Sequence, residues 1–172
     1  MMFMKYFVGL LVIIGVISGY YFYNKPEVVH LPQASEISKE VGFEVLLPSN
    51  LPSGYTPQSS RIQHIGDNGK IRYILEVSGP DSSTISIVQS PINDDFDLAE
   101  GVRTTLKKFS PRKVMIGTYE GWIYTQPTPY ETEDRILIWE DEKRIINIQV
   151  TPPNALSDDE IISLGKSLYT SN

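Results

Sequence analysis

The chain carries few side chains suited to acid–base or nucleophilic chemistry. It has two histidines, His30 and His64, and no cysteine. An unaccompanied histidine is usually polar surface, and nothing in the sequence places either one beside a serine that it would activate. Zinc sites need cysteine or several histidines, and no G-x-x-x-x-G-K-[ST] phosphate loop occurs. We therefore predict no catalytic residue, no metal and no cofactor.

Three acidic segments are the remaining candidates for chemistry: "NDDFDLAE" (93–100), "YETEDR" (130–135) and the acids at 158–160. The first fails as an EF-hand calcium loop, because Leu98 and Thr104 stand where glycine and a bidentate glutamate are needed. We interpret its acids as a helix start, which the helix dipole favours. Paired carboxylates can also hydrolyse glycosidic bonds when they face each other across a cleft. An envelope hydrolase is thus an alternative hypothesis, with the candidates Asp94, Asp97, Glu131 and Asp134.

Aromatic side chains form the group for which we predict binding. They lie in "TYEGWIYTQPTPYETED", beside a loop that Pro127 and Pro129 stiffen. Aromatic surfaces of this kind bind peptides, glycans or partner domains. Packing in the core is the competing interpretation, because two of the rings share one face of a predicted strand. The group consists of Tyr119, Trp122, Tyr124 and Tyr130, of which Trp122 and Tyr124 share the strand face.

The first 25 residues are typical of a membrane anchor. No charged residue occurs from Tyr6 to Tyr23, and a helix of this length spans about 27 Å, close to the hydrocarbon thickness of a bilayer. A cleaved signal peptide has a shorter apolar run and small residues before its cleavage site, whereas the first alanine is Ala34. We predict a retained single-pass anchor over residues 1–25, with cleavage as the alternative.

The anchor also predicts where the rest of the chain lies. Lys5 and Lys25 flank the apolar run, so charge bias does not set its orientation. A short N-terminal tail is typical of a signal anchor, so we expect residues 26–32 to be a tether and the C-terminal domain to be extracytoplasmic at the cell membrane. Gly15 and Gly19 have the small-xxx-small spacing of contacts between membrane helices, although glycine is common in such segments. A structural subunit of a membrane complex is therefore a further alternative.

The composition limits the class of partner. The net charge is −6, and an acidic exterior argues against nucleic acid, because phosphate binding needs clustered lysine and arginine. The lack of cysteine is compatible with an exported bacterial protein and excludes a lipidated cysteine as the tether. Residues 33–172 are enough for one domain with its own core.

That domain is predicted to combine a sheet with helices. Residues 33–41 have helical spacing with Gly42 as a stop, and "FEVLLP" (43–48) is expected to begin the sheet. Apolar and polar residues then alternate, as in half-buried strands. The alternating apolar positions are Ile71, Tyr73, Leu75, Val77, Ile85, Ile87, Ile136, Ile138, Ile146, Ile148 and Val150.

The connections between these strands are short. "GDNG" (66–69) and "EDEK" (140–143) are each expected to close an antiparallel hairpin. Apolar spacing predicts one helix over 98–109 and a C-terminal helix that starts with a capping box of Ser157 and Glu160. We therefore predict an α+β fold, an antiparallel sheet of about six to eight strands with flanking helices, preceded by one transmembrane helix.

Five strings of this sequence resemble the domain of unknown function numbered four-three-six-seven: "EVGFEVLLPSNLPSGY", "ISIVQS", "VMIGTYEGW", "LIWEDEKRIINIQV" and "DEIISLGKSL". The similarity runs from about Glu40 to Leu168. It implies an extracytoplasmic binding or regulatory domain of Gram-positive bacteria, of the kind found in envelope lipoproteins and anti-sigma-factor-like proteins, without catalytic residues. The chain departs from those relatives in lacking a lipidated cysteine and a cytoplasmic domain before the anchor. The most characteristic string contains Gly42, Phe43, Leu47, Pro48, Leu51, Pro52, Gly54 and Tyr55.

These observations predict a binding module. We expect a membrane-anchored extracytoplasmic domain that binds another envelope protein or a wall-derived ligand and does not catalyse a reaction. The string "LPSNLPSGY" is expected to form a rigid double turn that serves as scaffold.

Overall fold

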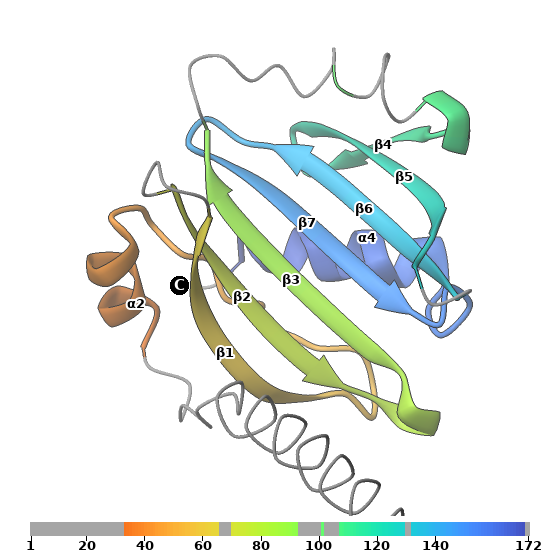
Figure 1. Cartoon of the computed structure of the whole chain (residues 1–172), viewed down its shortest axis with the longest axis horizontal. Coiled ribbons are helices and arrows are strands. Elements are labelled where there is room, and N and C mark those ends of the chain that lie inside the picture. Colours follow the sequence, from red (N-terminus) through yellow and green to blue (C-terminus); the bar gives the residue numbers. More distant parts are fainter. Residues whose placement is uncertain (1–32, 66–69, 93–100, 102–106, 130–131, 171–172) are drawn as a thin grey trace, which may run out of the picture.

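Seven strands form one antiparallel sheet, in the order β1-β2-β3-β7-β6-β5-β4 (Figure 1). The computed structural model describes residues 33–65, 70–92, 101, 107–129 and 132–170. The sheet and its helices confirm the predicted α+β class. The strands are β1 (Thr56–Ile65), β2 (Lys70–Ser78), β3 (Thr84–Pro91), β4 (Arg112–Ile116), β5 (Tyr119–Pro127), β6 (Glu133–Glu140) and β7 (Arg144–Thr151).

Among the described residues, two α-helices accompany the sheet, and their caps agree with the sequence. The helix α2 (Ala34–Val41) ends at Gly42, whose φ of 77° lies in the left-handed region that glycine adopts without a steric cost. The helix α4 (Asp158–Ser167) begins with the predicted capping box, in which Ser157 and Glu160 each accept a hydrogen bond from the other's backbone N–H. Two short 3-10 helices, η1 (Pro80–Ser82) and η3 (Lys107–Phe109), occur in connections.

One face of the sheet carries the hydrophobic core. The helix α4 lies against this face, behind the sheet in the view of Figure 1, and α2 contacts β2. The alternation predicted for β2, β3 and β7 is confirmed, because its apolar residues point into this core. The strand residues of the core are Tyr73, Leu75, Val77, Ile85, Ile87, Val114, Ile116, Ile123, Leu137, Trp139, Ile146, Ile148 and Val150.

Strand β6 faces the core with residues other than those expected. Alternation predicts that Ile136 and Ile138 face the core, but Leu137 and Trp139 lie there, and the two isoleucines are on the opposite face. Because "ILIW" (136–139) is apolar at every position, alternation cannot decide which half points inward. Trp139 is therefore fully buried in the core.

The segment "FEVLLP" (43–48) is not a strand, contrary to the prediction. It crosses the core face and is held there by a side chain instead of a neighbouring strand. The Gln89 side chain accepts a hydrogen bond from the Leu46 N–H (2.9 Å) and donates one to the Leu46 carbonyl (2.6 Å). Other side chains also bind this backbone, because Ser38 Oγ accepts the Val45 N–H (2.8 Å) and Arg144 donates to the Glu44 carbonyl (2.5 Å). The polar backbone groups of this segment are thus satisfied without strand pairing.

Gly79 is required by the ring of Tyr55. A Cβ atom at residue 79 would lie 2.2 Å from Tyr55 Cε1 and 2.6 Å from Ser83 Oγ. We expect Gly79→Ala to lower the free energy of unfolding by about 1–3 kcal/mol, the usual cost of overpacking. Urea titration followed by circular dichroism measures this loss. In a Tyr55→Leu background the same substitution should cost much less, and an equal cost in both backgrounds would contradict the steric explanation.

Asp158 joins α4 to two strands. Its carboxylate accepts hydrogen bonds from Arg135 (2.8 and 2.9 Å) and pairs with Arg112. Partial burial raises the pKa of Asp158, but the hydrogen bonds and charges of both arginines outweigh it, so the net pKa is below the ordinary value. A carboxyl with a lowered pKa stabilises the fold above its unfolded pKa of about 3.9, and this contribution is lost as the pH falls through the folded pKa.

We therefore expect Asp158→Asn to lower the melting temperature near neutral pH and to have little effect at about pH 2. Melting curves of the wild type and the variant over this range test the prediction. Asp159→Asn, one residue along the same helix turn, is the matched control and should show no such convergence. A difference for Asp158→Asn that stays constant with pH would contradict the ion-pair explanation.

Several predictions concern residues outside the described ranges. They are the anchor at 1–25 with Gly15 and Gly19, the tether at 26–32, the "GDNG" turn at 66–69, the acids Asp94, Asp97 and Glu131, Tyr130, and most of the helix expected at 98–109, of which the described part includes η3. Among the described residues, the structure contains no helix with the length and hydropathy of a membrane span.

Candidate functional site

The structure separates the predicted aromatic group. Trp122 and Tyr124 share one face of β5, as predicted, and lie opposite the core, where they pair with Ile138 and Ile136 of β6. Tyr119 lies on the other face, beside the core. Since Tyr130 is outside the described residues, the four side chains do not form one surface that can be described.

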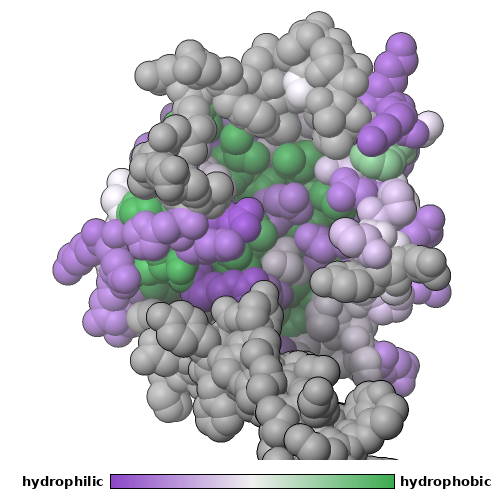
Figure 2. Space-filling model, viewed as in Figure 1, coloured by the Kyte–Doolittle hydropathy of each residue, from purple (hydrophilic) through white to green (hydrophobic). Residues whose placement is uncertain are grey.

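The face of the sheet opposite the core, here called the open face, is the first place to look for a site. Figure 2 views this side and shows hydrophobic side chains between hydrophilic ones. Tyr124 is buried here, with the Phe109 ring stacked on it at 5.9 Å between centroids. A hollow of about 330 Å³ lies over β2 and β3. Its arginines are already engaged, because Arg61 pairs with Glu76 (3.3 Å) and Arg72 binds Gln63 (2.6 Å).

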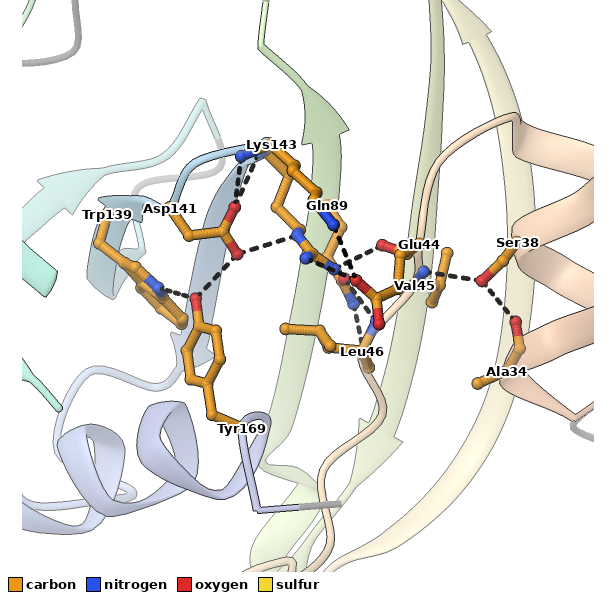
Figure 3. Close-up of polar contacts among 11 residues, drawn as sticks. Ala34, Ser38, Glu44, Val45, Leu46, Gln89, Trp139, Asp141, Lys143 and Tyr169 are labelled. Carbon is orange, nitrogen blue, oxygen red and sulfur yellow. Dashed lines mark hydrogen bonds and ion pairs between the residues drawn. The ribbon is translucent and has the colours of Figure 1, made fainter. Parts of the chain in front are cut away.

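A stronger candidate lies at the turn between β6 and β7, where a buried ion pair forms (Figure 3). Arg144 Nε lies 2.9 Å from Asp141 Oδ2, and both side chains are less than a tenth exposed. The same arginine donates to the Glu44 carbonyl (2.5 Å) and carboxylate (3.2 Å). The Asp141 Oδ1 atom accepts hydrogen bonds from the backbone N–H groups of Lys143 and Arg144. The ion pair therefore ties the turn to the segment before β1.

Tyr169 extends this network to the end of α4. Its hydroxyl donates to Asp141 Oδ2 (3.1 Å) and accepts from the indole N–H of Trp139 (2.9 Å). Burial raises the pKa of Tyr169 well above its ordinary value; the hydrogen bond from Trp139 opposes the shift, and the Asp141 carboxylate adds to it. The hydroxyl consequently stays protonated at physiological pH and remains a donor to Asp141.

Above this network lies a cleft with a volume of about 320 Å³, which we call the tyrosine cleft. Its aromatic walls are Tyr119 and Tyr169, with ring centroids 5.2 Å apart and an angle of 34° between the rings. The charged rim is exposed, and the base is the buried ion pair. The lining residues are Glu44, Leu46, Tyr119, Asp141, Glu142, Lys143, Arg144, Leu168 and Tyr169.

The chemistry of the tyrosine cleft suits binding. Both oxygens of Asp141 are used within the fold, and the Tyr169 hydroxyl has a donor and an acceptor partner, so neither is poised to take a proton from a ligand. The rim supplies the carboxylates of Glu44 and Glu142 and the ammonium group of Lys143. Sites with aromatic walls and a few charged groups of both signs are suited to small polar ligands that offer hydroxyl or amide groups.

The structure describes one of the four acids that were considered for hydrolysis, Asp134. Asp134 is buried on the open face, where its carboxylate accepts hydrogen bonds from Gln149 (2.6 Å) and Thr151 (2.5 Å). The described structure thus uses this acid as a cross-strand bond between β6 and β7. Asp94, Asp97 and Glu131 lie outside the described residues.

Sequence reasoning missed most of the tyrosine cleft. It found Tyr119, but it treated "EDEK" (140–143) only as a hairpin turn and gave no role to Arg144, Tyr169 or Glu44. One signal was available: an arginine that begins an apolar strand, three residues after an aspartate, is a candidate for a buried pair. Nothing in the sequence indicated that Glu44, one hundred positions away, would complete it.

The fold and the site together define an antiparallel α+β domain with a small cleft, walled by tyrosines, at one end of its sheet. No protein-family model, curated protein or solved structure matches this chain. Its resemblance to the domain of unknown function four-three-six-seven stays a prediction.

Proposed function

We propose that the chain is a membrane-tethered binding module of the cell envelope, and that its tyrosine cleft holds a wall-derived saccharide without catalysing a reaction. The observation that carries this proposal is the composition of the cleft. Two tyrosine rings, packed on each other at 5.2 Å between centroids, line the cleft together with a buried ion pair whose carboxylate oxygens are both engaged within the fold.

A saccharide matches these groups. The apolar C–H faces of a sugar ring pack against aromatic rings, and its hydroxyls act as donors and acceptors at once. Glu44 and Lys143, with side chains 59% and 66% exposed, can reorient around such hydroxyls. The volume of about 320 Å³ is at the lower end for small-molecule sites, so we expect one or two sugar residues to enter.

Binding of soluble peptidoglycan disaccharide-peptides to the full chain in detergent micelles tests the proposal. We expect saturable binding in calorimetry, and Tyr119→Ala should weaken it about tenfold, equivalent to about 1.4 kcal/mol. Met115→Ala is the control, because Met115 is 49% exposed on the opposite side of the neighbouring strand β4. No binding by the wild type, or equal binding by both variants, would refute the saccharide assignment.

The location is tested separately. We expect the chain in the membrane fraction, with its C-terminal domain digested when protease is added to spheroplasts from outside. Recovery of the intact chain from the cytosolic fraction would refute the tethered location without bearing on the cleft.

A further inference from the structure

A groove begins at the end of the sheet opposite the tyrosine cleft and runs along α4. It consists of two adjoining cavities of about 440 and 170 Å³, and Pro52 and Glu160 line both. The larger cavity also contacts the β2–β3 connection at Pro80 and the segment after β7 at Pro152. The smaller one continues along α4 to Ser167. We call this elongated site the proline groove.

The walls of the proline groove are rigid. Pro52, Pro80 and Pro152 have fixed φ angles and no backbone N–H. Tyr55 is buried behind them, and its hydroxyl accepts a hydrogen bond from Ser83 Oγ (2.9 Å). A preformed wall lowers the entropic cost of binding a flexible chain. The string "LPSNLPSGY" (47–55), which is predicted to serve as scaffold, therefore also lines the proline groove.

The backbone beside Pro80 is unusual. Asp81 and Ser82 have positive φ angles of 51° and 62°, a conformation that costs free energy for a residue other than glycine. Asp81 is exposed, lines the groove and has no ion-pair partner among the described residues. The connection thus holds a free carboxylate at one end of the site.

The charge of the groove is one-sided. Among the described residues, its lining includes two acids, Asp81 and Glu160, and no lysine, arginine or histidine. Hydrogen bonds from Ser157 lower the pKa of Glu160, which is therefore ionised. Both of those hydrogen bonds end on the Oε2 atom, so Oε1 remains for a ligand.

We propose that the proline groove binds an extended segment of a partner protein, with lysine or arginine side chains paired to Asp81 and Glu160. Charge complementarity selects a cationic segment, and the elongated, partly apolar course past Leu51 and Leu164 suits alternate apolar side chains of an extended chain. This interaction uses none of the residues that line the saccharide site.

Arrays of immobilised nonapeptides, randomised except for one fixed central residue, test the proposal with the full chain in detergent micelles. We expect retention where lysine or arginine is fixed and none where glutamate is fixed. The double variant Asp81→Asn with Glu160→Gln should lose about tenfold in affinity for a selected peptide. Both substitutions preserve the fold, because asparagine tolerates positive φ and glutamine completes a capping box.

The control removes two charges elsewhere. Glu36→Gln with Glu40→Gln removes the same two charges from exposed positions of α2, outside both sites, and this double variant should bind the peptide as the wild type does. Equal losses in both double variants would show general attraction to an acidic protein and would overturn the proposal. Absence of retention for every fixed residue would also overturn it, while leaving saccharide binding untouched.

Discussion

Arg144→Ala is expected to lower the free energy of unfolding by about 3–5 kcal/mol, because removing one partner of a buried pair leaves the other charge uncompensated. Asp141, with a side chain only 3% exposed, would lose its cation, and the segment at Glu44 would lose two hydrogen bonds. Urea-induced unfolding of the full chain in detergent micelles, followed by circular dichroism, measures the loss. A change of this size is a large fraction of the stability of a typical domain.

Two comparisons separate burial of the charge from loss of packing. Lys143→Ala removes an adjacent cation that is 66% exposed and 3.8 Å from Glu44, and it should cost less than about 1 kcal/mol. The double variant Arg144→Met with Asp141→Ala removes both charges and should recover part of the loss, since an unpaired buried carboxylate no longer remains. If the double variant is as unstable as the sum of the two single variants, the ion pair does not explain the effect.

The sequence predicted the local elements better than their faces. The helix ends at Gly42 and Ser157 depend on neighbouring residues only, and the structure has both. The alternation in β2, β3 and β7 also identifies the correct side, since polar residues such as Glu76, Ser86 and Asn147 separate most of the apolar ones. In "ILIW" (136–139) no polar residue separates them, and the chosen side was wrong. Local patterns thus predict a strand, but they do not always predict which of its two faces points into the core.

Long-range polar bonds account for the other errors. The segment 43–48 has a strand-like composition, and its backbone is held by Gln89, whose role no local pattern reveals. The base of the tyrosine cleft likewise joins Glu44, Asp141 and Tyr169, which are far apart in the sequence. A candidate site assembled from segments that meet only in the folded chain is therefore beyond what spacing can predict, although one of its walls, Tyr119, was identified.

Trp139→Ala is expected to be about as costly as the loss of the ion pair, at about 3–5 kcal/mol, the range for removing a large aromatic side chain from a core. The Trp139 side chain is 0% exposed, and its ring lies against α4 at Gly165, where an added Cβ atom would be 3.3 Å from Trp139 Cη2. Truncation would leave a cavity between the sheet and the helix and would remove the hydrogen bond to Tyr169. Thermal or urea unfolding followed by circular dichroism measures the effect.

Trp122→Ala is the matched control, because it truncates the same side chain on the open face, where Trp122 is only half-buried. It should cost less than half as much, since less apolar area is withdrawn from water there. Trp139→Phe should lie between the two, because it keeps a ring in the core but leaves the Tyr169 hydroxyl without its donor. Equal losses for Trp122→Ala and Trp139→Ala would mean that both faces of β6 and β5 are packed to the same extent. The core would then extend to both sides of the sheet, and the distinction between a core face and an open face would be wrong.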